Sequence, residues 1–302
     1  MTIDNLQNFL EEFGDDVRFS FDIKKKNWFN IGGKTKVFYN ADNLNNLVNF
    51  LKKINNQERI FILGAGSNTL ITDNMFDGII IKLGKNFRNI SLLGEDIIIA
   101  GSAALDKSLS IFAAENSIAG FEFLSCIPGT IGGGIRMNAG CFKSEFKDLL
   151  VSVQAVDKFG SVKTILAKDI KFDYRKSNLP DDLIFLSASF KAIKGNIDKI
   201  KDKIEKLKKE KEENQPLKIK TSGSTFKNPI LQTKKKVWEL IKESVPLNKE
   251  FGDAYISEKH CNFFVNRGNA SFDDMKKLID FVSKRVLEKT GINLEKEIKI
   301  LE

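Results

Sequence analysis

The sequence is poor in the residues that bind metal ions and form disulfides. It has three cysteines, Cys126, Cys141 and Cys261, and a single histidine, His260, among 302 residues. The cysteines are odd in number, and none has the Cys-x-x-Cys spacing typical of a zinc site. We therefore expect no metal centre, and we interpret the cysteines as free thiols in a reducing compartment.

Long apolar runs and long basic blocks are also missing. The first sixteen residues are acidic and lack the basic and apolar parts of a leader, and no apolar run approaches the ~20 residues that span a bilayer. The 48 Lys and Arg are interspersed with 40 Asp and Glu, giving a net charge of +8. We interpret this balance as a solvated surface and expect a cytoplasmic protein with no membrane or nucleic-acid partner, although a small anionic ligand such as a nucleotide is compatible with it.

A hydrophobic content of 42% can supply a large core. In the first half of the chain, apolar runs and helical periodicity alternate, which indicates a mixed α/β or α+β sheet domain. We expect strands at 36–40, 59–63, 78–83 and 96–101, helices at 43–54 and 105–117, and a hairpin over 149–166 with its turn at 158–161.

The second half begins with a change in composition. Apolar residues recur at helical spacing in "GNIDKIKDKIEKLKKEKEENQ" (195–215), which ends at Pro216. The apolar seam covers fewer than three heptads, so a single docked helix at a domain boundary is favoured over a coiled coil. Further on we expect a loop at 221–229, a helix at 237–244, a strand at 262–266, a helix capped by Ser271 and ended by Gly291, and a strand at 294–301.

Two stretches are rich in glycine. "IPGTIGGGIRMNAG" (127–140) holds five of the 21 glycines, which favours a ligand cradle over a bulge or a close helix crossing. "LGAGSN" (63–68) follows a strand but lacks the third glycine of a dinucleotide fingerprint and the ending of a P-loop. From its residues alone, this loop fits a phosphate-holding turn and a plain strand-exit turn equally well.

Six motifs in register carry a resemblance to a known family. "LGAGSNTLI", "IPGTIGGGIRMNAG", "FDYRKSNL", "TSGSTFKNP", "HCNFFVN" and "LEKEIKI" occur in this order, and the chain resembles the UDP-N-acetylenolpyruvoylglucosamine reductases of bacterial peptidoglycan synthesis over about residues 27 to 300. The resemblance is to the shorter type, because residues 175–215 leave no room for the extra substrate loop of the longer type. Departures from the family pattern include Lys34-Thr35, Gly134, Cys141-Phe142 and Lys296.

The resemblance implies an α+β fold with a vanillyl-alcohol-oxidase-like FAD-binding domain and a C-terminal α+β substrate-binding domain. We divide the chain into lobes at 1–84 and 85–200 and a substrate domain at 201–302. The two glycine loops would clasp the FAD diphosphate and let the isoalloxazine lie against the backbone, without a covalent bond. The implied cofactor-binding residues are Gly64, Ala65, Gly66, Ser67, Asn68, Pro128, Gly129, Thr130, Gly132, Gly133, Asn138, Ala139 and Gly140.

The family's reaction implies roles for three further residues. NADPH reduces FAD, hydride passes to C3 of the enolpyruvyl ether, and C2 is protonated to give UDP-N-acetylmuramate. Arg175 matches the arginine that faces the substrate carboxylate, Ser224 the proton donor, and Glu297 the catalytic glutamate. Lys227 and Asn228 are expected substrate contacts.

Each of these assignments has a plainer reading. Without the motifs, Arg175 is a hairpin-edge charge, Ser224 a turn serine with Ser222 close by, and Glu297 a surface charge. In a strand, Glu295 and Glu297 would share a face, so spacing alone does not choose between them. For the whole chain, the alternatives are an oxidase of sugars or phenols on the same fold, and a nucleotide-binding module without turnover. We expect a monomer or weak oligomer.

Overall fold

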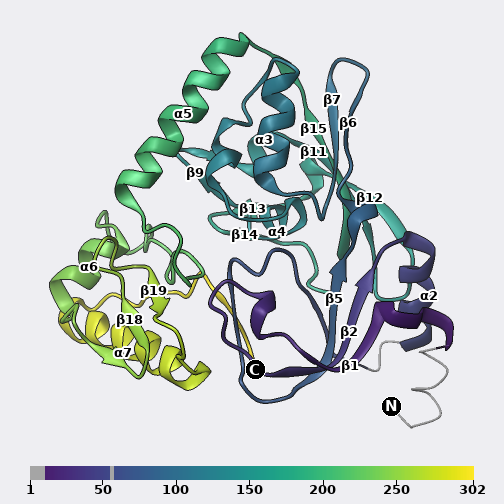
Figure 1. Ribbon diagram of the computed structural model, residues 1–302. Helices are drawn as coiled ribbons and strands as arrows, with labels where there is room; N and C mark the ends of the chain where they lie inside the picture. The colour runs from purple at the N-terminus through teal and green to yellow at the C-terminus, as the bar shows by residue number, and fades with distance from the viewer. Residues whose placement is uncertain (1–10, 55–57) are drawn as a thin grey trace. The chain divides into compact units, whose positions relative to one another are not determined.

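Strands and short helices alternate along the computed structural model, which describes residues 11–54 and 58–302 (Figure 1). The expectation about a leader concerns residues 1–16, of which residues 1–10 lie outside the described residues. The chain forms two compact units, each made of separate stretches of sequence. Unit 1 comprises residues up to Phe21, Thr35–Ala65 and Asp77–Lys209, and unit 2 comprises Asp22–Lys34, Gly66–Phe76 and Glu210–Glu302. The division into 1–84, 85–200 and 201–302 stays a prediction.

The first sheet of unit 1 is covered by an amphipathic helix. It has the order β1-β2-β5-β3, formed by β1 (Val17–Asp22), β2 (Lys34–Ala41), β5 (Phe76–Leu83) and β3 (Ile60–Ile62). Helix α2 (Leu44–Ile54) lies beside β1 and β2 (Figure 1) and buries Leu47, Phe50, Leu51 and Ile54. The ring of Phe50 stacks on Tyr39 of β2 with centroids 4.1 Å apart. The predicted helical periodicity of this segment is therefore confirmed.

The second sheet of unit 1 is antiparallel and has five strands. Its order is β12-β11-β15-β7-β6, formed by β12 (Val162–Leu166), β11 (Leu150–Val156), β15 (Ile184–Lys191), β7 (Ile97–Gly101) and β6 (Ile90–Leu93). The predicted hairpin is β11-β12, closed by the pair Val156 and Val162. The central strand β15 was not predicted. Helices α3 (Asp106–Glu115) and α4 (Ile131–Arg136) contribute to the same hydrophobic core as this sheet.

Short strand pairs and one long helix complete unit 1. The pairs are β8 (Ile118–Ala119) with β16 (Ile193–Lys194), β9 (Gly140–Cys141) with β10 (Ser144–Glu145), and β13 (Phe172–Asp173) with β14 (Lys176–Ser177). Helix α5 (Ile197–Asn214) buries Ile200, Ile204 and Leu207 as its spacing predicts, and the boundary between the units falls inside it. None of the described helices combines the length and the apolar character that a membrane span requires.

Unit 2 is built around two helices, a small sheet and a parallel strand pair. Its elements are α6 (Val237–Ser244), α7 (Phe272–Thr290), the sheet β17 (Glu250–Phe251), β18 (Ala254–Ile256) and β19 (Phe264–Asn266), and the pair β4 (Thr69–Ile71) with β20 (Lys299–Leu301). The terminal strand is shorter than the predicted 294–301. It begins only at Lys299. Leu294 and Ile298 are buried in the core of unit 2, but Lys296 between them is exposed, so residues 294–298 do not follow the alternation of a strand.

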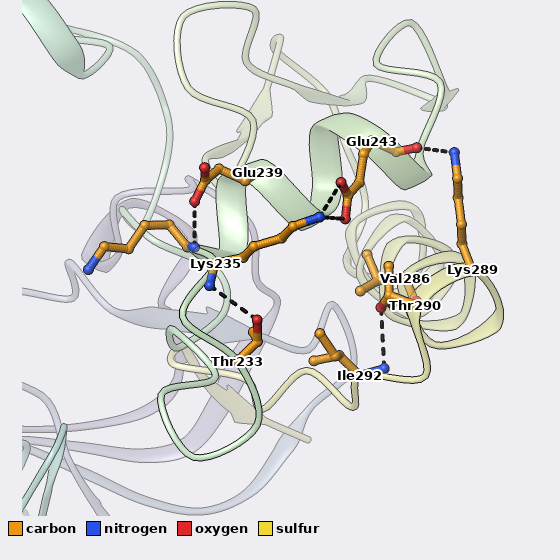
Figure 2. Close-up of polar contacts among 9 residues, drawn as sticks. Thr233, Lys235, Glu239, Glu243, Val286, Lys289, Thr290 and Ile292 are labelled. Carbon is orange, nitrogen blue, oxygen red and sulfur yellow. Dashed lines mark hydrogen bonds and ion pairs between the residues drawn. The ribbon is translucent and has the colours of Figure 1, made fainter.

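Polar contacts tie the carboxyl ends of α6 and α7 together (Figure 2). The Lys235 ammonium lies 2.8 Å from the Glu243 carboxylate, and the Lys289 ammonium donates to the Glu243 carbonyl. At the end of α7, the Thr290 hydroxyl donates to the Val286 carbonyl at 2.7 Å and accepts from the Ile292 amide at 3.2 Å. These bonds satisfy carbonyls and fix the turn where the helices end.

The amino end of α7 has the predicted capping box. The Ser271 hydroxyl accepts from the Asp274 amide at 3.1 Å, and the Asp274 carboxylate accepts from the Ser271 amide at 3.0 Å. The helix ends at Gly291, whose φ of 72° is the left-handed conformation that glycine adopts without strain. Sequence signals at both ends therefore determine where this helix begins and ends.

We predict that Ser271→Ala lowers the free energy of unfolding by about 1 kcal/mol, because one amide of the first turn loses its acceptor. Urea unfolding followed by circular dichroism measures this loss. Ser283→Ala, inside the same helix, is the matched control and should not destabilise the protein. Equal losses in the two variants would contradict a capping role for Ser271.

Candidate active site

A cavity of about 410 Å³ opens within unit 1, a size in the range of small-molecule sites. Both predicted glycine loops line it, through Gly64 and Ala65 on one side and Thr130, Gly132 and Gly133 on the other. Three cations, Lys82, Arg88 and Arg136, share the lining with apolar side chains such as Leu63, Leu83 and Phe185. The cavity therefore offers positive charge, exposed backbone and apolar walls to one ligand.

The two glycine loops touch each other at the cavity. A Cβ atom on Gly64 would lie 2.6 Å from the Thr130 hydroxyl, so only glycine allows this approach. The ammonium of Lys82, from β5, donates to the Gly64 carbonyl. The loop at 63–68 is divided between the units, since Gly64 and Ala65 belong to unit 1 and Gly66, Ser67 and Asn68 to unit 2.

Most glycines of the stretch 127–140 face the protein's own atoms. An added Cβ would lie 2.5 Å from the Asp106 carboxylate at Gly129, 3.1 Å from Ser102 at Gly132, 2.2 Å from the Phe146 ring at Gly134, and 2.3 Å from the Ser144 carbonyl at Gly140. Only Gly133 has room, with its nearest neighbour at 3.5 Å. Close packing of the chain thus accounts for four glycines, while Gly132 and Gly133 also line the cavity.

The other predicted cofactor residues of this stretch lie outside the cavity lining. Pro128, Ala139 and Gly140 flank α4, and Asn138 is fully buried with a φ of 45°. The Asn138 side chain donates to Glu145 at 3.0 Å and accepts from the Lys147 amide at 3.1 Å. These bonds hold the β9-β10 hairpin, and a contact of these residues with the cofactor stays a prediction.

None of the three cavity cations was predicted. Arg136 donates to the Leu179 carbonyl at 3.0 Å and to the Leu183 carbonyl at 2.6 Å, and burial lowers the pKa of its guanidinium. The Cζ atom of Arg136 lies over the ring of Phe185, 4.3 Å from the ring centre. Lys82 could have been found, since it is the single charge in the apolar run "GIIIKL", but no sequence signal pairs it with Gly64.

Arg175 lies beside the β9-β10 hairpin of unit 1. One of its nitrogens, Nη2, donates to the Gly140 carbonyl at 2.6 Å, and Nη1 lies 3.9 Å from the Glu145 carboxylate. Its Cζ lies 4.9 Å from the centre of the Tyr174 ring. Its φ of 56° is a strained conformation for a residue with a side chain, and such strain is found at functional sites more often than elsewhere.

Ser224 and Glu297 lie on neighbouring segments of unit 2. Phe226 and Lys296 form an antiparallel bridge, and the Glu297 amide donates to the Thr225 carbonyl at 2.8 Å. The Asn68 side chain donates to the Glu297 carbonyl at 3.1 Å, so a predicted cofactor residue joins the same place. Glu297 therefore stands outside regular strand, on backbone fixed from two sides, whereas Glu295 is exposed.

The structure separates Ser224 from Ser222. The Ser222 side chain is buried and donates to the Thr69 carbonyl at 3.3 Å, while Ser224 is half-buried. Gly223 between them has a φ of 75° and open space where a Cβ would lie. Ser222 thus holds the loop, and Ser224 has room for an approaching molecule.

Lys227 and Asn228 make contacts within unit 2. The Lys227 ammonium lies 2.5 Å from the Glu295 carboxylate, and the Asn228 side chain accepts from the Val237 amide at 3.0 Å where α6 begins. A contact of either residue with substrate stays a prediction.

His260 lines a separate cavity of about 410 Å³ with Trp238 and Lys242, and burial lowers the pKa of its imidazole. All three cysteines are free thiols, as expected.

Comparisons with known proteins agree with this architecture. The model of an FAD binding domain matches residues 35–166, and that of the UDP-N-acetylenolpyruvoylglucosamine reductase C-terminal domain matches residues 215–301. The UDP-N-acetylenolpyruvoylglucosamine reductase of Pelagibacter ubique is 64% identical to this chain, and the match covers 100% of both chains. The Rickettsia typhi reductase is 43% identical, and the match covers 94% of this chain and 95% of the relative. The crystal structure of the Thermus caldophilus enzyme superposes with a TM-score of 0.80 at 28% identity, covering 95% of this chain and 98% of that one.

The fold and the matched domain define an FAD-dependent oxidoreductase with an α+β FAD-binding domain. The chain belongs to the UDP-N-acetylenolpyruvoylglucosamine reductase family. The cavity residues fit the cofactor, because the cations suit a diphosphate, the open Gly133 backbone allows close approach, and the apolar walls suit a flavin ring.

Asp106 is a buried carboxylic acid at the start of α3, behind this cavity. Its side chain is fully buried, and neither carboxyl oxygen has a hydrogen-bond partner among the described residues. Burial alone raises the pKa of this carboxyl well above its ordinary value, because no neighbouring group stabilises the charged form. Asp106 therefore packs against Gly129 in surroundings that favour the neutral acid.

We predict that Gly134→Ala lowers the free energy of unfolding by about 1 to 3 kcal/mol. The new methyl group collides with the ring of Phe146, which cannot move away because Phe123 and Phe190 pack around it. Gly133→Ala, one residue earlier in α4, has space and should be neutral or stabilising by about 0.5 to 1 kcal/mol. Chemical unfolding compares the variants, and equal stabilities would be incompatible with this packing.

We predict that Asp106 makes the protein less stable as pH rises. The raised pKa keeps the native state protonated while the unfolded state releases its proton above about pH 4, so stability falls with increasing pH until the native pKa is reached. Relative to Asp106→Asn, the wild type should lose at most about 1.4 kcal/mol per pH unit in that window. Urea unfolding between about pH 5 and about pH 9 measures this difference.

Ser110→Ala is the control for this measurement. Ser110 lies one turn further along α3 and is buried, and residues 11–54 and 58–302 provide no hydrogen-bond partner for its hydroxyl, but it does not ionise in this range. Its replacement should shift stability equally at every pH. A constant difference between the wild type and Asp106→Asn over the whole range would rule out a buried neutral acid.

Proposed function

We propose that the protein reduces the enolpyruvyl ether of UDP-N-acetylglucosamine to UDP-N-acetylmuramate, with NADPH as the electron source and dissociable FAD as cofactor. The observation that carries this proposal is the cavity built from both glycine loops in a chain of this reductase family. Residues 176–215 are taken up by β14, β15, β16 and α5, which supports the shorter type of the family. FAD, when bound, supplies the hydride that NADPH delivers and that C3 of the substrate receives.

Arg175 would stabilise the negative charge that hydride addition creates. Charge moves from C3 through C2 into the substrate carboxylate, and a guanidinium meets a carboxylate with two donors in a fixed plane. The Gly140 carbonyl accepts from Nη2 of Arg175 and so holds the guanidinium in place. A preorganised cation of this kind stabilises developing charge without reorganising.

Ser224 would deliver the proton to C2, and Glu297 would support the carboxylate end of the intermediate. A serine hydroxyl is a weak acid, so it protonates only a strongly basic carbon that lies close to it. The open space at Gly223 and the fixed backbone around Glu297 support these roles. The expected setting is peptidoglycan precursor synthesis in the cytoplasm, by a monomer or weak oligomer.

The visible absorption spectrum tests the function itself. A flavin spectrum that bleaches with NADPH under anaerobic conditions and returns only with the enolpyruvyl substrate would support the proposed reaction. Reoxidation by sugars or phenols would favour an oxidase, and bound flavin without turnover would favour a binding module. A protein that cannot take up FAD would contradict the proposal.

We predict that Ser224→Ala leaves the rate of flavin reduction by NADPH near normal and lowers the rate of reoxidation by substrate by at least about a hundredfold, because only the second half-reaction needs the proton. Stopped-flow absorbance measures both rates. Ser222→Ala is the matched control, since it removes a buried loop contact and should leave both half-reactions active. Equal losses of both rates in Ser224→Ala would refute the assigned role.

A further inference from the structure

Glu145 joins the segments that surround Arg175. One oxygen of its carboxylate, Oε2, accepts from the Asn138 amide group at 3.0 Å and lies 2.7 Å from the Lys147 ammonium. The other oxygen, Oε1, lies 3.9 Å from Nη1 of Arg175. The side chains of Glu145 and Arg175 are 20% and 16% exposed, so this pair is screened less by solvent than a surface ion pair.

Because of the register of the β9-β10 hairpin, the Gly140 carbonyl and the Glu145 carboxylate both lie near the Arg175 guanidinium. Glu145 is directly opposite Gly140 in the antiparallel pair, and the Gly140 carbonyl accepts from Nη2 of Arg175. A Cβ on Gly140 would lie 2.8 Å from Cγ of Glu145, so the glycine provides the space through which the Glu145 side chain passes. One cross-strand pair therefore supplies an uncharged acceptor and a carboxylate to Arg175.

The backbone around this pair is strained in several places. Phe142 and Lys143, which form the hairpin turn, have φ angles of 51° and 68°, and Asn138 and Arg175 also have positive φ. Residues with side chains hold such conformations only where surrounding contacts impose them, and they cluster at functional sites. The bond between Glu145 and the buried Asn138 is a contact of that kind.

We propose that Glu145 is a positioning residue for Arg175. It sets the direction of the guanidinium plane from one side while the Gly140 carbonyl fixes it from the other. Arg175 would therefore meet the substrate carboxylate with a guanidinium plane that is already fixed before charge develops there. This inference rests on the proposed function, in which Arg175 meets that carboxylate.

A purely structural role for Glu145 is the competing explanation. The Glu145 amide donates to the Asp148 carboxylate at 2.8 Å, so the residue also begins the short helical turn 146–148. Replacement by glutamine keeps the backbone bond and the size of the side chain but removes the charge. A test must therefore separate the orientation of Arg175 from the stability of the hairpin.

The test is a double-mutant cycle of Glu145→Gln and Arg175→Ala with three readouts. These are the rate of reoxidation of reduced flavin by the enolpyruvyl substrate, the Kd of that substrate for the oxidised protein from the shift in flavin absorbance, and the melting temperature. In the wild-type background, Glu145→Gln should slow reoxidation by about ten- to a hundredfold and weaken substrate binding, because a small misplacement of a positioned group costs that much. Flavin reduction by NADPH and the melting temperature should stay near wild type.

In the Arg175→Ala background, Glu145→Gln should change neither the reoxidation rate nor the Kd further, because its effect passes through Arg175. Lys147→Met is the matched control. It removes the other charged partner of the carboxylate from a half-exposed position and should leave all three readouts near wild type.

Four results would overturn the proposal. Equal effects of Glu145→Gln in both backgrounds would show action independent of Arg175. A lower melting temperature with equal loss of both half-reactions would show a structural role. Normal reoxidation and Kd in Glu145→Gln would contradict this inference alone, whereas a wild-type protein that is never reoxidised by the enolpyruvyl substrate would overturn the proposed function as well.

Discussion

The cavity of unit 1 depends on how closely the chain can approach itself between residues 129 and 140. Helix α4 contacts Ser102 and the Phe146 ring at positions without side chains, and the Gly129 backbone lies against a buried neutral acid on α3. A methyl group at either contact of α4 would push it away from the sheet or from the aromatic core. The position of Gly133, which lines the cavity, follows from these contacts on both sides of it.

The proposed catalytic side chains are held mainly through the main chain. The Gly140 carbonyl accepts a hydrogen bond from the Arg175 guanidinium. The Thr225 carbonyl accepts one from the Glu297 amide, and the Glu297 carbonyl accepts one from the Asn68 side chain. Backbone groups have fewer conformations than long side chains, so they hold a charged or hydroxyl group in place at a low cost in conformational entropy.

Local signals in the sequence predicted α2, α3, α5, α6, α7 and the β11-β12 hairpin well, because each depends on periodicity or on residues at its own ends. The short helix α4, inside the glycine-rich stretch, was not predicted. Helix α7 is the clearest case, with Ser271, Asp274 and Gly291 all in their expected roles. Strand β15 was missed, since serines interrupt its apolar run, and the terminal strand was drawn too long. The number of glycines in 127–140 could not show whether a ligand or the Phe146 ring lies against the backbone there. The hydrogen bond from Lys82 to the Gly64 carbonyl depends on tertiary structure, which the sequence does not display.

The discontinuous make-up of unit 2 has a consequence for biosynthesis. Asn68 and Glu297 are bonded across 229 positions, and strand β4 finds its parallel partner only in β20 at the end of the chain. Such a unit has high contact order and cannot form its complete set of strand pairs until β20 has left the ribosome. Residues 66–76 are made early, so they must wait with unpaired strand edges during translation, and removing the last few residues would deprive them of their partner.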